Sequence, residues 1–307
     1  ICLSLIKQME IYKSKVKSFA GELKAINKRY NTISLFRLTS IVIFLGSLYF
    51  YLDTNDKIYL VAAGVFFIAF ILLMRFHSKL LFNRKVNEAL LKINKDEVSY
   101  LENKELPFEN GQEFIDFQHP YAYDLDIFGD HSLFQNLNRT ATFIGNKTLA
   151  KQLLQLASTE IILDNQEAIK ELSGKLDWRQ EFLALAKVTE DSESSYKKLL
   201  QWNTFNSEPL PRWLIVFSYV SPLLFIVGII TYLWSSNLTV LSSLSYLFVL
   251  NLIVLGAFTK RIKLEISNSD DIDKVIGKYG LLLEKIEKEQ YQSKKLINLQ
   301  ETLKIKA

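Results

Sequence analysis

The chain has 307 residues, of which 49% are hydrophobic and 23% are charged, and its formal net charge is +4. A single cysteine excludes an internal disulfide framework and a cysteine-rich metal site, and so small a net charge does not by itself indicate a nucleic-acid partner. Eleven glycines and five prolines are few for this length, which favours long helices over strands and turns.

Residues 1–32 are rich in lysine and predict an amphipathic helix that lies on an anionic membrane surface or packs on a cytoplasmic domain. They are too charged for a secretory signal. The first methionine is Met9, and the chain stops inside a helical pattern. We therefore expect a fragment of a longer protein, or a true start at Met9.

Four apolar blocks approach or reach the roughly 20 residues that a helix needs to cross a bilayer. They cover residues 33–52, 58–76, 213–234 and 238–258. Short polar loops join them in pairs, so the sequence predicts two transmembrane hairpins, at 33–76 and 213–258. No acid, lysine or histidine lies near the middle of a span, which favours membrane anchors over a transporter.

The charges that flank the spans predict an orientation. Lysines and arginines gather before the first span and after the second span of each hairpin, whereas the two connecting loops contain only Lys57 as a basic residue. The positive-inside rule then places both termini and the central segment in the cytoplasm, in a multi-pass protein of the bacterial inner membrane.

The segments 77–212 and 259–307 predict a cytoplasmic helical bundle, because their apolar residues recur at helical spacing and no strand pattern is present. One helix should continue inward from residue 77 to about 105, and a loop follows it. A short helix should start after Asp130 or Ser132, and a further one should begin around Asp164 and break at Gly174. Residues 270–305 predict a helix or a helix pair, and the fold class is all-α.

Two stretches of the central segment follow a recognisable pattern. Residues 132–149 read "SLFQNLNRTATFIGNKTL" and residues 165–183 read "NQEAIKELSGKLDWRQEFL". Residues 124–187, which contain both stretches, resemble the opening of the core (lever) domain of the MutS DNA mismatch repair ATPases. The matched positions of the first stretch that we single out are Leu133, Phe134, Leu137, Asn138, Arg139, Thr140, Gly145 and Leu149.

The resemblance implies the N-terminal part of a membrane-anchored MutS-related protein, because the family's mismatch-reading and ATPase domains have no counterpart here. An ATPase domain would follow residue 307. We expect no cofactor in this chain, and ATP with Mg²⁺ for that domain. The implied partners are the lipid bilayer, DNA as a candidate, and a second copy in a homodimer formed through the ATPase domain.

No catalytic constellation is present in the sequence. "GNKT" at 145–148 resembles the tail of a phosphate-binding loop, but it lacks the upstream glycine and the preceding strand. We interpret Gly145 as a turn and residues 146–148 as the start of a helix. We interpret Arg139 as a residue that bonds backbone and carboxylate groups where helices meet, rather than as a DNA contact.

No metal site is predicted either, because no cysteine or histidine pair has a metal-ligand spacing. Asp124, Asp126 and Asp130 lack the full calcium-loop pattern and are typical of capping or a solvated loop. The lysines after residue 270 alternate with glutamates, which favours a solvated helix with i,i+4 ion pairs over a nucleic-acid surface.

The expected function is therefore a scaffold that links a downstream ATPase to DNA or another partner at the membrane. A non-enzymatic, membrane-anchored protein-interaction module is the alternative. DNA binding that depends on salt would favour the first, and absent or salt-insensitive binding the second.

Overall fold

The computed structural model describes residues 2–102, 106–188, 192–201, 211–235 and 237–306. Within these ranges the protein contains ten α-helices, one 3-10 helix (η1, Gln112–Phe114) and no strand, so the predicted all-α fold is confirmed. The chain divides into two compact units. One is Ile1–Asp191 together with Lys278–Ala307, and the other is Ser192–Gly277.

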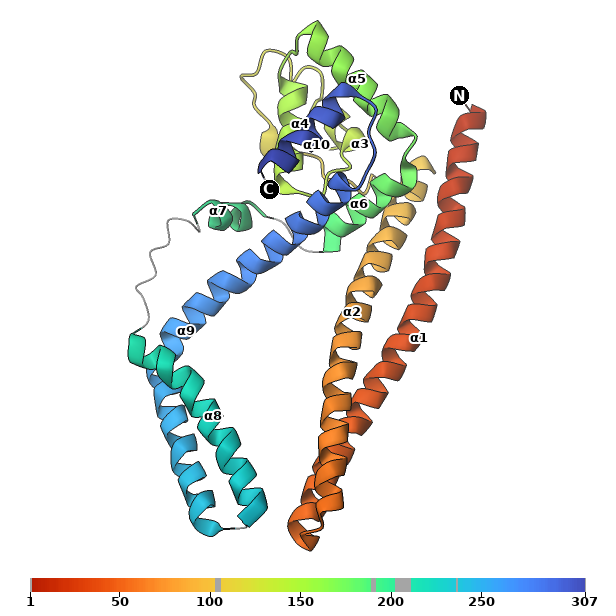
Figure 1. Cartoon of the computed structure of the whole chain (residues 1–307). Coiled ribbons are helices and arrows are strands. Elements are labelled where there is room, and N and C mark those ends of the chain that lie inside the picture. Colours follow the sequence, from red (N-terminus) through yellow and green to blue (C-terminus); the bar gives the residue numbers. More distant parts are fainter. Residues whose placement is uncertain (1, 103–105, 189–191, 202–210, 236, 307) are drawn as a thin grey trace. The chain divides into compact units, whose positions relative to one another are not determined.

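A hairpin of two long helices supports the first unit. Helices α1 (Cys2–Thr54) and α2 (Lys57–Leu101) lie side by side, as Figure 1 shows. Their turn is fixed by Asn55, which has a left-handed φ of 57°, and by Asp56, whose carboxylate accepts a hydrogen bond from the backbone N–H of Ile58 at 3.0 Å. Such a capping aspartate satisfies a donor that a helix start leaves unpaired.

The N-terminal part of the hairpin is more continuous than predicted, because the predicted amphipathic helix and the first span form one helix of 53 residues. The predicted inward continuation of the second span is confirmed, since α2 is one helix of 45 residues. Aromatic pairs join the two helices along their length, among them Tyr30 with His77 and Phe44 with Phe67, whose ring centroids lie 4.4 Å and 5.3 Å apart.

Four helices are long and apolar enough to cross a membrane: α1, α2, α8 (Arg212–Ser235) and the first part of α9 (Leu238–Glu287). At most 11% of each apolar stretch is buried inside the protein, so these stretches are not core helices of a water-soluble fold. The predicted association with a membrane is supported by this observation.

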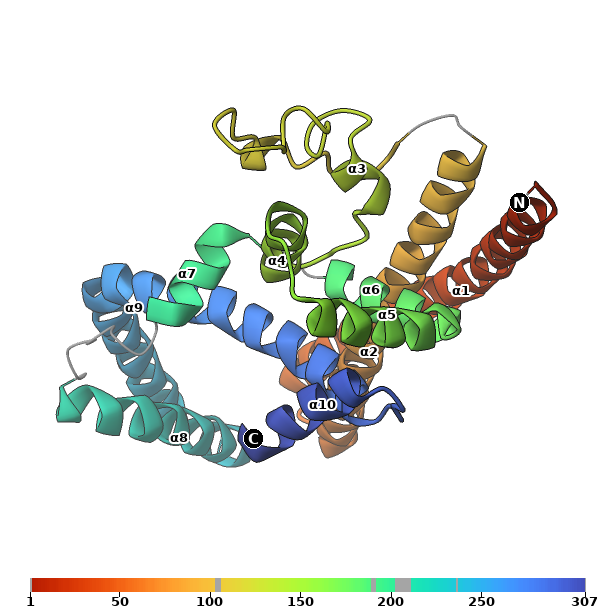
Figure 2. The ribbon, with the colours of Figure 1, turned by 90° about the horizontal axis from the view of Figure 1, so that it is seen from above.

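Short helices complete the first unit around the C-terminal end of α2. They are α3 (Leu133–Leu137), α4 (Phe143–Leu154), α5 (Thr159–Ser173), α6 (Leu176–Val188) and α10 (Lys294–Lys306). Helix α6 packs on α2, where Leu90, Ile93 and Ala184 form a buried cluster, and α10 packs on α5. Figure 2 shows α5, α6 and α10 close together.

Several predicted boundaries require correction. Helix α5 begins at Thr159, directly after its N-cap residue Ser158, rather than near Asp164. The break at Gly174 is confirmed, and the region after residue 270 is a helix pair, the end of α9 followed by α10. The helix predicted to reach residue 105 ends at Leu101, and residues 103–105 lie outside the described part of the chain.

The second unit contains α7 (Glu193–Gln201) and the hairpin of α8 and α9. A polar contact joins the two long helices within their apolar stretches, where the hydroxyl of Ser221 donates to the side-chain oxygen of Asn251 at 2.9 Å. Gly228 allows close approach, because a Cβ there would lie 2.6 Å from Leu244. Small residues and side-chain hydrogen bonds are the usual means of association between helices in lipid.

Candidate functional site

Residues 132–149, which we call the motif segment, begin with α3, and Ser132 caps this helix. The Ser132 hydroxyl accepts a hydrogen bond from the backbone N–H of Gln135 at 3.2 Å, so Ser132, and not Asp130, is the N-cap. Phe134 is fully buried. From the sequence we also expect Leu133 and Leu137 to form an apolar stripe with Phe134, and this is wrong, because both leucines are exposed.

Asn138 and Thr140 shape the turn that leaves α3. The buried Asn138 side-chain oxygen accepts hydrogen bonds from the Thr140 backbone N–H at 3.0 Å and from the Thr140 hydroxyl at 2.7 Å. Its amide nitrogen donates to the carbonyl of Glu109 at 3.3 Å. The asparagine therefore holds the turn closed and attaches it to the preceding loop.

Arg139 connects this turn to α2. Its guanidinium donates to both carboxylate oxygens of Glu97, at 2.5 Å and 3.2 Å, and to the carbonyls of Asn136 and Asn138 at 3.0 Å and 3.1 Å. The guanidinium carbon also lies 3.4 Å from the ring centroid of Phe108. The predicted role of Arg139, bonding backbone and carboxylate groups where helices meet, is confirmed. Because its N–H donors are used within the protein, the Arg139 guanidinium has a structural role rather than that of a free DNA contact.

The glycine of the motif lies inside a helix, which corrects the predicted turn. Helix α4 starts at Phe143, and Thr142 caps it by accepting from the backbone N–H of Gly145 at 3.0 Å. A Cβ at position 145 would lie 2.8 Å from the Thr142 hydroxyl oxygen, so the cap requires a glycine here. Leu149 is half-buried farther along α4.

The phosphate-loop likeness of residues 145–148 has no structural counterpart in the described chain. The ammonium of Lys147 lies over the Phe143 ring at 4.5 Å, and the Thr148 hydroxyl donates to the carbonyl of Ile144 within the helix. Asn146 donates to the carboxylate of Glu109 at 2.8 Å. These side chains support α4 and its neighbours instead of forming a phosphate cradle.

A cavity of about 330 Å³ opens beside the turn at residues 138–142 that connects α3 to α4, which we call the motif turn. Its walls come from α1, α2, the turn, the start of α4 and α6, and they are largely apolar. The lining residues are Tyr12, Ile93, Glu97, Arg139, Thr140, Ala141, Thr142, Gly145, Leu176, Trp178, Arg179, Gln180, Phe182, Leu183 and Ala186. Five of them belong to the motif segment, so this cavity and its walls form the candidate functional site, which we call the motif cavity.

Charges of both signs converge at the motif cavity. Burial and the carboxylate of Glu97 raise the pKa of Tyr12, and the nearby Arg179 and Arg139 offset only part of this. The Tyr12 hydroxyl is therefore a neutral hydrogen-bonding group at physiological pH. The cavity offers apolar walls with a few polar groups, which is a composition suited to packing or binding and lacks a nucleophile with an adjacent base.

The end of α9 also reaches the motif turn. The buried Lys278 side chain donates to the carbonyl of Ala141 at 3.4 Å, and its neighbours Val275 and Leu282 are buried as well. Two helices that carry predicted spans, α2 and α9, therefore contact the same few residues of the motif segment. The lysine pattern of the sequence did not distinguish the buried Lys278 from the exposed Lys288.

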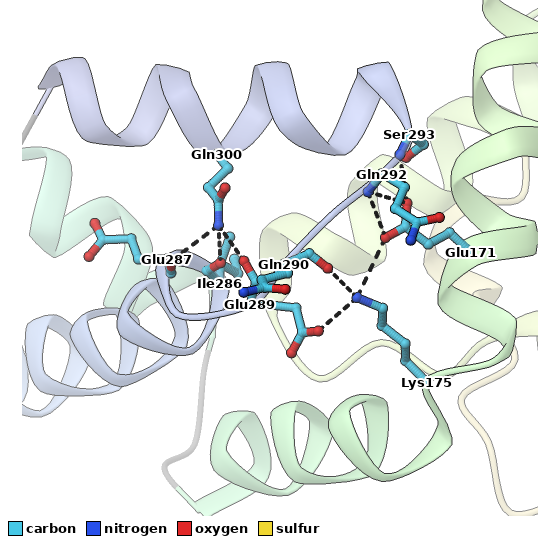
Figure 3. A network of polar contacts seen from close by, with 9 residues as sticks. All are labelled: Glu171, Lys175, Ile286, Glu287, Glu289, Gln290, Gln292, Ser293 and Gln300. Atoms are coloured by element: carbon cyan, nitrogen blue, oxygen red, sulfur yellow. Dashed lines mark hydrogen bonds and ion pairs between the residues drawn. The ribbon is translucent and has the colours of Figure 1, made fainter.

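A polar network attaches the turn between α9 and α10 to the junction of α5 and α6 (Figure 3). The Glu171 carboxylate accepts from the backbone N–H groups of Gln292 and Ser293 at 3.0 Å and 2.8 Å. Lys175 pairs with Glu289 at 2.7 Å and also donates to the carbonyl of Gln290.

The same network closes the end of α9. The Gln300 amide nitrogen donates to three carbonyls at this end, those of Ile286, Glu287 and Glu289, at 2.9, 3.1 and 2.8 Å. Side chains thus satisfy the backbone groups that two helix ends leave unpaired. The network fixes the angle at which α10 leaves α9.

Most described lysines near the chain's end are occupied by local partners. Lys288 pairs with Glu284 in the predicted i,i+4 manner, whereas Lys285 pairs with Glu181 on α6. Lys295 donates to Asn165 on α5. The predicted solvated helix with i,i+4 ion pairs therefore holds at Lys288, whereas Lys285 and Lys295 contact other helices. The side chains of residues 260–274 lie outside the described part of the chain.

No protein-family model, no curated protein and no solved structure matches this chain. The likeness of residues 124–187 to the MutS core domain therefore stays a prediction.

Proposed function

We propose that this chain is the membrane-anchored core of a MutS-related ATPase. It would transmit movement between an ATPase domain beyond residue 307 and a partner at the bacterial inner membrane, with both termini and residues 77–212 in the cytoplasm. The ion pair between Arg139 and Glu97 carries the proposal, because it attaches the MutS-like segment to a helix that also contains a membrane span.

The shape of the helices supports a role in transmission. Helix α2 runs without interruption from the apolar stretch to Glu97, and α9 runs without interruption from its apolar stretch to Lys278. A packed helix transmits force because its interior resists compression. Movement of the motif segment would therefore act on the span of α2, and movement of that span on the motif segment.

The test uses the complete gene product, reconstituted in liposomes of phosphatidylethanolamine and phosphatidylglycerol. We expect ATP hydrolysis that requires Mg²⁺ and that changes when DNA is added. Glu97→Gln should leave basal hydrolysis unchanged and reduce the DNA response, whereas the exposed Glu160→Gln on α5 should leave both unchanged. A gene that encodes no glycine-rich nucleotide loop after residue 307 would refute the proposal.

A second candidate function is a non-enzymatic protein-interaction module on the membrane. The observation in its favour is that Arg139 and the lysines of α9 and α10 named above are engaged within the protein, which leaves those groups unavailable for phosphates. A salt titration of DNA binding separates the two functions. Release of many counterions on binding gives a steep decrease in affinity with salt.

A further inference from the structure

We propose that the loop between α2 and α3 contains a recognition slot for the cationic side chain, lysine or arginine, of a partner protein. The slot is a hollow of about 60 Å³ lined by Ile115, Asp116, Ala122, Tyr123, Asp126 and Phe128. It is separate from the motif cavity, and the inference does not rest on the function proposed above.

The lining chemistry selects a cation. The lining residues include two acids, Asp116 and Asp126, and two aromatic residues, Tyr123 and Phe128. One oxygen of the Asp116 carboxylate accepts a hydrogen bond from the backbone N–H of Gln118 at 2.9 Å, which leaves its other oxygen for a ligand. Aromatic faces attract ammonium and guanidinium groups, and carboxylates form charge-assisted hydrogen bonds with them. The volume accepts the end of one side chain and is too small for a nucleotide or a folded element.

The charge of residues 106–131 within this loop adds to this selection. Residues 106–131 contain six carboxylates and neither lysine nor arginine. In the described part of the protein, none of the six forms an ion pair with a lysine or arginine. Their summed field attracts a cationic partner and repels the phosphates of nucleic acid and of anionic lipid. The six are Glu109, Glu113, Asp116, Asp124, Asp126 and Asp130.

Hydrogen bonds hold the walls of the slot in place. The backbone N–H of Asp126 donates to the carbonyl of Tyr123 at 3.1 Å, and that of Ile127 to the carbonyl of Ala122 at 3.0 Å. Phe128 packs against the fully buried Phe134 with ring centroids 5.4 Å apart. A preorganised site binds more tightly because little ordering remains for the binding step.

An apolar surface beside the slot extends the site. Phe117, Tyr123 and Leu125 are 74%, 61% and 63% exposed, and the rings of Phe117 and Tyr123 lie 5.2 Å apart. Exposed aromatic residues are typical of protein interaction sites. The occupant that fits is a protein segment that presents one lysine or arginine to the slot and an apolar side chain to these rings.

The experiment measures fluorescence anisotropy of a fluorescein-labelled peptide of alternating lysine and glycine. The full chain is held in nanodiscs of phosphatidylcholine, whose zwitterionic headgroups do not attract the peptide. We expect saturable binding by the wild type. Asp126→Asn should weaken it about tenfold, the equivalent of about 1.4 kcal/mol. Asparagine tolerates the left-handed φ of 47° at this position, so the loop keeps its shape.

Three controls make the result specific. Tyr123→Ala should weaken binding about as much as Asp126→Asn, whereas Tyr123→Phe should stay within about twofold because the ring remains. Asp124→Asn, an acid of the same loop outside the slot, should also stay within about twofold. The peptide with acetylated lysines should not bind.

The proposal is overturned if the acetylated peptide binds equally well, or if Asp124→Asn is as harmful as Asp126→Asn, since either result indicates general attraction. It is also overturned if the wild type does not bind. Sedimentation of the nanodiscs tests for self-association. If Asp126→Asn abolishes a dimer, the cationic side chain comes from a second copy of this chain, and the proposal of a different protein as partner is wrong.

Discussion

Asn94 on α2 and Gln180 on α6 face each other in the interior of the first unit. The Gln180 amide nitrogen donates to the Asn94 side-chain oxygen at 2.9 Å, and the Asn94 amide nitrogen donates to the carbonyl of Leu90 at 2.8 Å. Both side chains are buried, and Gln180 also lines the motif cavity. A second hydrogen bond, from the Asn94 amide nitrogen to the Gln180 side-chain oxygen at 3.4 Å, completes the pair, which joins the wall of the cavity to a helix that carries a candidate span.

Removing one partner of this pair should destabilise the protein strongly. Asn94→Ala leaves the Gln180 amide buried without its partner and should lower the free energy of unfolding by about 2–3 kcal/mol. The double replacement Asn94→Leu with Gln180→Leu should lose less than the sum of the single replacements, because no unpaired amide remains. Thermal unfolding in nanodiscs, followed by circular dichroism, measures both. Asn83→Ala on the exposed face of α2 should change little, and equal losses at both positions would contradict the prediction.

The joint between Arg139 and Glu97 should depend on the shape of the guanidinium as well as on its charge. Arg139→Lys keeps the charge but loses the two-point contact and the bonds to two carbonyls, so we expect a loss of about 2 kcal/mol in stability. Glu97→Gln should lose a similar amount. Chemical denaturation with tryptophan fluorescence provides the measurement. Full stability of Arg139→Lys would show that charge alone suffices.

The turn between α9 and α10 should loosen in acid. Burial raises the pKa of Glu171, but hydrogen bonds from the backbone N–H groups of Ser293 and Gln292 outweigh it, and the pKa lies below its ordinary 4.5. A depressed pKa means that the stabilisation is complete above the unfolded value and is lost as the pH falls through the folded one. Hydrogen exchange of residues 290–300, corrected for intrinsic rates, should therefore accelerate below about pH 4.5.

Glu171→Gln is the control for this pH dependence. Glutamine still accepts hydrogen bonds but does not titrate, so protection of residues 290–300 should be lower at neutral pH and nearly constant in acid. An identical acid-induced loss in the variant would assign the effect to another group.

Gly111 should tolerate no side chain. Its φ is +67°, and an added Cβ would lie 2.7 Å from the ring of Phe134. Gly111→Ala should therefore lower the free energy of unfolding by about 2 kcal/mol, from backbone strain and overpacking together. Gly21→Ala is the matched control, because this helical glycine has open space around its Cβ position and should gain about 0.5–1 kcal/mol. Melting temperatures of the two variants should move in opposite directions.

The orientation of the chain can be read from cysteine labelling. In a Cys2→Ser background, Asp53→Cys at the end of α1, beside the first hairpin turn, should react with a membrane-impermeant maleimide on intact cells. Ser194→Cys at the start of α7 should react only after the membrane is permeabilised. The reverse pattern would invert the proposed topology.

Much of the fold could be predicted from periodic patterns along the sequence and from the chemical needs of single residues. The four apolar blocks, the break at Gly174 and the helical joint at Arg139 were all predictable, because each depends on periodicity or on the need of a buried charge for partners. The partners themselves were not predictable. Glu97 and Arg139 are 42 positions apart, and nothing local in the sequence selects one glutamate over its neighbours.

Short elements were the least predictable. Gly145 suggested a turn, yet the Thr142 cap three residues earlier starts the helix before it. Asn94 did carry a signal, since it is a polar residue within an apolar stripe that includes Leu90 and Ile93, and such a position often marks a buried hydrogen bond. The slot at Asp126 had no such signal in the sequence, because the conformation of a loop does not follow from a periodic pattern.

Because α2 is long and unbroken, a small change in its tilt displaces its far end by a large distance. Glu97 lies roughly 20 residues, or about 30 Å, beyond the end of the apolar stretch at residue 76. A change of about 10° in the tilt of this helix, such as a thinner bilayer requires, displaces Glu97 sideways by roughly 5 Å. That displacement exceeds the reach of the Arg139 contact, so the motif turn must follow the helix or release it. If α2 crosses a bilayer, a change in the thickness of that bilayer would thereby act on the residues that are packed around Glu97.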